Sequence, residues 1–217
     1  AGALQVHTTG AYNCAFGEAA LDANTTANNN VAVGYGALTS NTTGASNVSV
    51  GNYALGTCTT TNNNTAMGDG AMRYLTGTQN VAMGMQAGHY ISSGDSNVAI
   101  GFQASVGSSG NTTGNDNVSI GFATGFGLTS GYNNTLLGRA AGYGVTTGYR
   151  NIGLGGDALR ANSPAGNVTT GNDIACIGDD NLASLYCVQT SISSSDERDK
   201  TDIENFDYGL DFIKQMR

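Results

Sequence analysis

The chain has 217 residues with 33 glycines, one proline and no tryptophan, and only 11% of its residues are charged. Its formal net charge is −8 and no basic patch occurs, so a nucleic-acid partner is not expected. No apolar run is long enough to span a bilayer and no basic leader precedes an apolar stretch, so we expect neither membrane insertion nor a targeting segment.

A short unit, Asn-x-small-apolar-Gly, recurs through most of the chain, and residues 30–38 are a representative copy. The glycines that end the unit, called anchor glycines below, are Gly17, Gly34, Gly51, Gly68, Gly84, Gly101, Gly121, Gly138, Gly155 and Gly178. Most successive anchor glycines are about 17 residues apart, and the last step is the longest. A nearly constant period with small insertions is typical of stacked coils.

The period also limits the fold class. Helical arrays need roughly 33 or more residues per repeat, whereas about 17 residues suit a coil of two short strands and two turns. We therefore predict an all-β parallel β-solenoid of about ten coils. Such a thin coil has little interior, so one chain buries little surface for its length and we expect oligomerisation.

Two columns of residues precede the anchor glycines. The position just before the glycine is always large and apolar: Phe16, Val33, Val50, Met67, Met83, Ile100, Ile120, Leu137, Leu154 and Ile177. The position before that is small in every coil except the one with Leu136. Since side chains alternate along a strand, the two columns face opposite ways. We interpret the small column as the interior and the large column, from Val33 to Leu154, as packing against other chains; the reverse assignment is the alternative.

Other positions also recur. A column of alanines three positions after the glycine, followed by Leu or Met, predicts the second strand, and the anchor glycine predicts a positive φ or a close backbone approach. The repeated asparagine opens each strand, and stacked copies predict an amide ladder. Clusters rich in Asn and Thr predict turns on the rim, with loop insertions near residues 107–115 and 161–171.

Several polar and aromatic residues admit a functional and a structural interpretation. Acidic residues near the anchor glycines, which suggest glycoside cleavage, are better explained as solvated turn residues; they are Glu18, Asp69, Asp157, Asp179 and Asp180. Tyr132, Tyr143 and Tyr149 either stack on sugars or cover the coil edge, and the second is favoured. The threonines suggest an ice-binding surface, but no Thr-x-Thr column is evident. No calcium-binding nonapeptide or other metal motif occurs, so no cofactor or metal is expected.

The four cysteines show no CxxC spacing. Cys14 and Cys176 occupy apolar repeat positions, which predicts buried free thiols rather than a disulfide framework. Cys58 and Cys187 complete the set.

The repeat ends near residue 182. Residues 183–194 predict a final strand and a serine-rich linker, and residues 195–217 are charged and then amphipathic. Ile203, Phe206, Leu210 and Ile213 follow helical spacing, which predicts a short C-terminal helix.

The repeat Asn-x-Ala-apolar-Gly-x-x-Ala-Leu resembles the head repeats of trimeric autotransporter adhesins and of related phage tail-fibre proteins, over roughly residues 11–182. The resemblance implies a left-handed parallel β-roll in each of three chains, packed around a common axis.

The tail resembles the start of the endosialidase-type intramolecular chaperone domain of phage tailspikes and fibres. Its motif Ser-Asp-x-Arg-x-Lys-x-x-Ile matches Ser195, Asp196, Arg198, Lys200 and Ile203. The resemblance implies that the full-length protein cleaves itself between Ser194 and Ser195, with Ser195 as nucleophile and Lys200 as general base. The alternative is a serine-rich linker followed by a capped, solvated helix.

Together these features predict a structural and adhesive fibre module of a phage or prophage tail. Residues 1–182 form its receptor-binding β-roll, residues 183–194 a strand and linker, and residues 195–217 the start of the chaperone. The expected partners are two further copies, other tail-fibre components and a host surface glycan or protein, and the expected location is the virion. No enzyme activity on an external substrate is expected. The alternatives are a bacterial trimeric adhesin head at the cell surface and a tailspike-type polysaccharide depolymerase.

Overall fold

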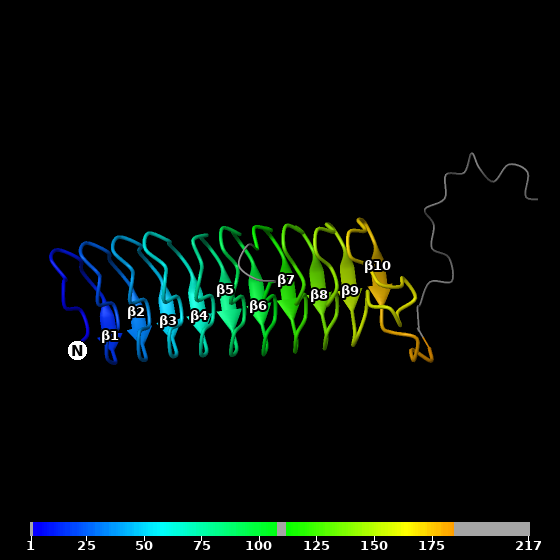
Figure 1. The fold of residues 1–217 in the computed structure, drawn as a ribbon, viewed down its shortest axis with the longest axis horizontal. Helices are drawn as coiled ribbons and strands as arrows, with labels where there is room; N and C mark the ends of the chain where they lie inside the picture. Colours follow the sequence, from blue (N-terminus) through cyan, green and yellow to red (C-terminus); the bar gives the residue numbers. More distant parts are fainter. Residues whose placement is uncertain (1, 108–111, 185–217) are drawn as a thin grey trace, which may run out of the picture. The chain divides into compact units, whose positions relative to one another are not determined.

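The computed structural model describes residues 2–107 and 112–184, and the described residues up to 182 form a single stack of β-coils (Figure 1). Each strand has three residues, and the ten described strands pair in parallel in one sheet whose order follows the chain. The strands are β1 (Cys14–Phe16), β2 (Val31–Val33), β3 (Val48–Val50), β4 (Thr65–Met67), β5 (Val81–Met83), β6 (Val98–Ile100), β7 (Val118–Ile120), β8 (Thr135–Leu137), β9 (Ile152–Leu154) and β10 (Ala175–Ile177). The predicted all-β parallel solenoid is confirmed.

The register keeps each column of the repeat in line from coil to coil. Ala32 pairs with Ser49, and Val33 pairs with Val50. The middle residue of each strand points inward and is buried, except Ala15 at the start of the stack, which is half-buried. The small column therefore fills the interior and the large column lies outside. This confirms that the small column is the interior and rules out the reverse, whereas packing of the large column against other chains stays a prediction.

The anchor glycines from Gly17 to Gly155 have both properties expected of them, a positive φ and a close approach to the next coil. All ten anchor glycines have positive φ, from 73° to 135°. At Gly84, a Cβ atom would lie 2.6 Å from the carbonyl oxygen of Gly101 in the next coil. Only glycine combines this backbone conformation with this close approach at low cost, which explains why the position repeats.

The predicted second strand is wrong. The alanine column is buried, but the Leu or Met that follows it adopts a left-handed conformation, with φ of 50° at Leu21, 50° at Leu38 and 45° at Met72. An extended strand requires negative φ, so these residues belong to a turn. Their side chains are fully buried, and that burial offsets a backbone strain of about 1–3 kcal/mol each.

Leu136, the one large residue in the inward column, fits because glycines replace bulky residues around it. Gly125 and Gly142 stand where five other coils have Leu or Met, and a Cβ on Gly142 would lie 2.7 Å from a methyl carbon of Leu136. Gly153, inward in the next coil, is also in reach, because its Cβ would lie 3.2 Å from Leu136. The interior volume is thus conserved although the residues that fill it change position.

The predicted asparagine ladder is confirmed. Asparagines from Asn13 to Asn151 precede the strands at the same register. The side-chain oxygen of Asn80 accepts hydrogen bonds from the backbone N–H of Asn97 at 2.9 Å and from its side-chain amide at 3.2 Å. The amide of Asn80 in turn donates to the carbonyl of Gly94 at 2.9 Å. The ladder satisfies buried turn groups that have no sheet partner.

Candidate interaction surface

The outward face of the sheet is apolar along its whole length. The first and third residues of every described strand point outward, and most are Val, Ile, Met or Leu. Several are strongly exposed in the single chain: Phe16 is 75% exposed, Leu137 47% and Met67 41%. With strands about 4.8 Å apart, the ten strands make a strip about 43 Å long. We call this strip the outward face.

The eight residues expected to contact other chains all lie on the outward face. They are Val33, Val50, Met67, Met83, Ile100, Ile120, Leu137 and Leu154. The position after the anchor glycine widens the strip in the middle coils, where Met85, Phe102 and Phe122 are exposed. Phe102 and Phe122 stack with ring centroids 5.4 Å apart. With strands of three residues, each about 10 Å long, this strip covers on the order of 400 Å², and apolar patches of this size on soluble proteins often mark interaction sites.

Cys14 was expected to be buried, but it also lies on the outward face. It is a free thiol but is exposed, because it occupies the first, outward position of β1. Cys176, in the inward column of β10, is free and buried as expected, and so is Cys58. Burial raises the pKa of the Cys58 thiol to about 12. Cys187 lies outside the described residues.

The rim tyrosines stack on neighbouring coils, as the structural interpretation predicts. Tyr132 and Tyr149 lie 4.8 Å apart at an interplanar angle of 8°, and Phe126 and Tyr143 lie 4.9 Å apart at 4°. The guanidinium group of Arg160 lies 5.0 Å from the centre of the Tyr143 ring. Because Phe126 and Arg160 both pack on the Tyr143 ring, this ring holds the two side chains in place.

A column of single threonines runs along part of the rim, and it is not the paired Thr-x-Thr column sought for an ice-binding surface. The hydroxyl of Thr25 donates a hydrogen bond to the carbonyl oxygen of Thr42, and the hydroxyl of Thr42 donates one to the carbonyl oxygen of Thr59, both at 3.1 Å. These threonines lie in turns, and their hydroxyls bond the next coil. The column therefore stabilises the rim, because each hydroxyl proton is used in a bond to the neighbouring coil.

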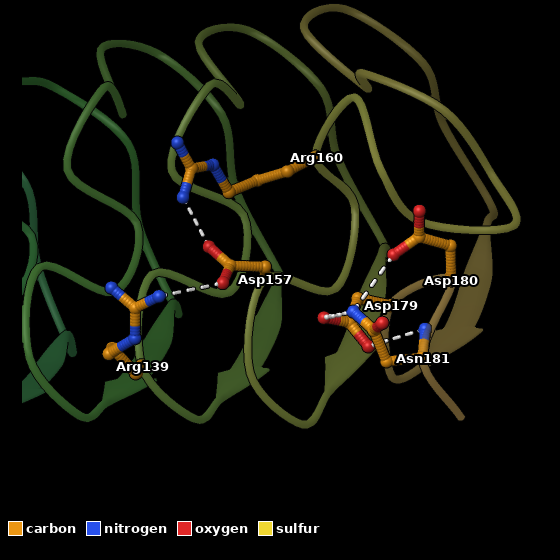
Figure 2. A network of polar contacts seen from close by, with 6 residues as sticks. All are labelled: Arg139, Asp157, Arg160, Asp179, Asp180 and Asn181. Atoms are coloured by element: carbon orange, nitrogen blue, oxygen red, sulfur yellow. Dashed lines mark hydrogen bonds and ion pairs between the residues drawn. The ribbon is translucent and has the colours of Figure 1, made fainter. Parts of the chain in front are cut away.

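A cluster that the sequence did not indicate joins Arg139, Asp157 and Arg160 (Figure 2). The Asp157 carboxylate accepts a hydrogen bond from Arg139 at 3.0 Å and a second from Arg160. Its side chain is only 20% exposed, so it is not the solvated turn residue that we expected. The spacing in the sequence could have indicated this cluster, because Asp157 and Arg160 are three residues apart and Arg139 lies about one coil earlier.

The other acidic pair near the end of the stack forms a local turn. Asn181 donates its side-chain amide to Asp179 and Asp180, each at 3.0 Å, and its backbone N–H to Asp179 (Figure 2). These bonds lower the pKa of the Asp179 carboxyl, the side-chain amide contributing most.

Among the described residues, no group of three or more His, Cys, Asp or Glu side chains could hold a metal ion. Nor does this part of the chain contain a helix long and apolar enough to cross a membrane. The proposed self-cleavage residues Ser195 and Lys200, the bond at Ser194 and the predicted C-terminal helix lie outside the described residues.

Comparisons with family models, curated proteins and solved structures found no match for this chain.

Proposed function

We propose that this chain is a structural and adhesive fibre module of a phage or prophage tail, assembled as a homotrimer and displayed on the virion. The observation that carries the proposal is the outward face. Its apolar residues are in register over ten strands, and one chain leaves them half-buried or exposed. Three copies around a common axis bury these faces against one another, which the hydrophobic effect favours.

The resemblances support the tail-fibre assignment within this proposal. The repeat resembles those of trimeric fibres and adhesins, and the motif at Ser195 resembles the start of a trimerisation chaperone. In the full-length protein, Ser195 and Lys200 then act in self-cleavage, and the mature module has no activity on an external substrate. Host attachment, to a surface glycan or protein, takes place on the rim and its loops, because the outward face is covered in the trimer.

The repeat equally resembles bacterial adhesin heads, so a trimeric head on a bacterial surface is the second candidate. Both candidates use the outward face in the same way. They differ in where the chain is displayed.

Immunogold electron microscopy with an antibody against the repeat separates the candidates. The tail-fibre proposal predicts gold on the tails of purified virions and none on uninfected cells of the host. Gold on the surface of uninfected cells supports the adhesin instead. Absence of label from both contradicts the two candidates together.

Self-cleavage has its own test. Mass spectrometry of the full-length product should find a fragment that ends at Ser194, and Ser195→Ala should leave the chain intact. An intact wild-type product, unchanged by the substitution, overturns the assignment of Ser195.

A further inference from the structure

A pocket of about 140 Å³ opens on the rim beside the cluster of Arg139, Asp157 and Arg160. It is lined by Asp157, Arg160, Ala161 and Asn162. Two of the lining residues are charged and one is an amide, so the pocket presents both hydrogen-bond donors and acceptors. We call it the rim pocket.

The rim pocket exists because this coil is longer than the others. The step from Gly155 to Gly178 is about six residues longer than the usual repeat period. The extra residues form a loop whose base is closed by the backbone hydrogen bond from Val168 to Leu159, at 3.1 Å. Leu159 and Val168 are both buried in the core, so the insertion leaves the coil beneath it intact.

The loop is itself ordered by local hydrogen bonds. The backbone N–H of Ser163 donates to the carbonyl of Arg160 at 2.9 Å, and that of Gly166 donates to Ser163 at 2.8 Å. The carbonyl of Asn162 accepts from the backbone N–H of Asp180 at 2.6 Å, which ties the loop to the next coil. The wall of the pocket is therefore held on both sides.

The polar groups in the pocket are also positioned in advance. The backbone N–H of Asp157 donates to the carbonyl of Arg139 at 2.8 Å, and its carboxylate is paired with Arg139 and Arg160. The guanidinium of Arg160 is further supported by the Tyr143 ring. Each of these groups keeps hydrogen-bonding capacity, because a carboxylate has about four acceptor sites and an arginine has five N–H donors.

We propose that the rim pocket binds one saccharide unit of a host surface glycan through its hydroxyl groups, a proposal that rests on the attachment function above. Sugar hydroxyls donate to the Asp157 carboxylate and accept from Arg160 and Asn162. This mixed set suits a neutral polyhydroxylated ligand. The carboxylate at the pocket wall disfavours an anionic ligand, and Arg160 disfavours a cation.

The test measures binding of the whole chain to an array of bacterial surface glycans, with saturation-transfer NMR on methyl glycosides of glucose, galactose and mannose. Two substitutions probe the pocket. Asp157→Asn removes the charge but suits the left-handed conformation of this residue, φ 55°, and Asn162→Ala removes the exposed amide. Each should weaken glycan binding about tenfold or more, because Asp157→Asn replaces a charged acceptor by a weaker neutral one and Asn162→Ala removes a hydrogen-bond partner of the bound hydroxyls.

The matched control is Arg150→Gln, which breaks the ion pair with Asp173 on the same part of the stack but does not line the pocket. It should bind like the wild type, and circular dichroism should show that all three variants keep the wild-type fold. If the wild type binds no probe, or if Asp157→Asn and Asn162→Ala bind as tightly as the wild type, the rim pocket is not the site. Immunogold labelling of virion tails would still stand in either case, so the two proposals fail separately.

Discussion

The two faces of the sheet obey opposite rules although they are built from the same ten strands. The inward face is closed within one chain, because its side chains are small, buried and matched in volume to the turn residues. The outward face is open, because its side chains are large, apolar and left in contact with water. Packing within one chain therefore accounts for the interior of this solenoid, whereas burial of the outward face requires the association proposed above.

The largest effect is expected where the coils approach most closely. Gly84→Ala should destabilise the fold by roughly 4 kcal/mol, because it combines a φ of 130° with a Cβ 2.6 Å from the next coil. The control is Gly156→Ala, where nothing lies within 4 Å of the added Cβ and φ is not in the left-handed region. Urea unfolding should separate the two variants, and equal stabilities would contradict the account of the anchor glycines.

Because Leu136 fills the space that Gly142 leaves open, a second substitution should partly restore the stability lost through the first. Leu136→Ala should cost about 3 kcal/mol through the cavity it leaves, and Gly142→Leu should cost a similar amount through its clash with Leu136. The double variant recreates the pattern of the other coils, and thermal unfolding should show it to be more stable than either single variant. Additive losses in the double variant would argue against shared volume.

The asparagine ladder supplies hydrogen bonds to buried backbone groups at the edge of the core. Asn80→Ala should cost about 3 kcal/mol, because it leaves the buried backbone N–H of Asn97 and the carbonyl of Gly94 without their partners. Asn62 also accepts a hydrogen bond from a backbone N–H, that of Ala45, but it is partly exposed. Water can therefore replace its side chain, and Asn62→Ala should cost less than about 1 kcal/mol in the same urea titration.

Much of this fold could be predicted from the sequence, because residues that recur at a fixed period lie on the same face of the sheet in every coil. The alternation of Val33 with Ala32 predicted which side is interior. The missing second strand could not be predicted, since a leucine such as Leu38 rarely adopts positive φ and its burial is visible only in three dimensions. Cys14 was misjudged because an apolar repeat position here means the outward face as often as the core.

The rim pocket was less accessible to sequence reasoning. Asp157, Arg160 and Asn162 follow no repeat, since the insertion that brings them together occurs once. The sequence around Asp157 suggests a solvated carboxylate in a turn. Its ion pair with Arg139, one coil earlier, is visible only in the structure. Sites built on departures from a repeat are therefore the part of a solenoid that its period cannot predict.

Breaking the outward face should leave the coil folded. We expect the double variant Met67→Asp and Leu137→Asp to change the free energy of unfolding of the single chain by less than about 1 kcal/mol, because both side chains point away from the core and are exposed. It should prevent association, because charges on this face cannot be buried without partners. Thr43→Asp on the exposed rim is the control and should associate normally. Light scattering and circular dichroism report the two properties separately.

The smallest effect is a difference in thiol reactivity without a change in stability. In the dissociated double variant, iodoacetamide at mildly alkaline pH should modify Cys14 quickly, because this outward thiol is exposed. Cys176 and Cys58 should react only on unfolding, because both are buried and the pKa of Cys58 is raised to about 12, which leaves almost no reactive thiolate. Equal rates at Cys14 and Cys176 would mean that the two faces are wrongly assigned.

The central claim is that the outward face is covered by two further copies of the chain, and sedimentation equilibrium of the purified protein tests it most directly. The account predicts a folded particle with three times the 22.0 kDa mass of one chain. A folded particle of 22.0 kDa that persists at micromolar concentration would contradict it.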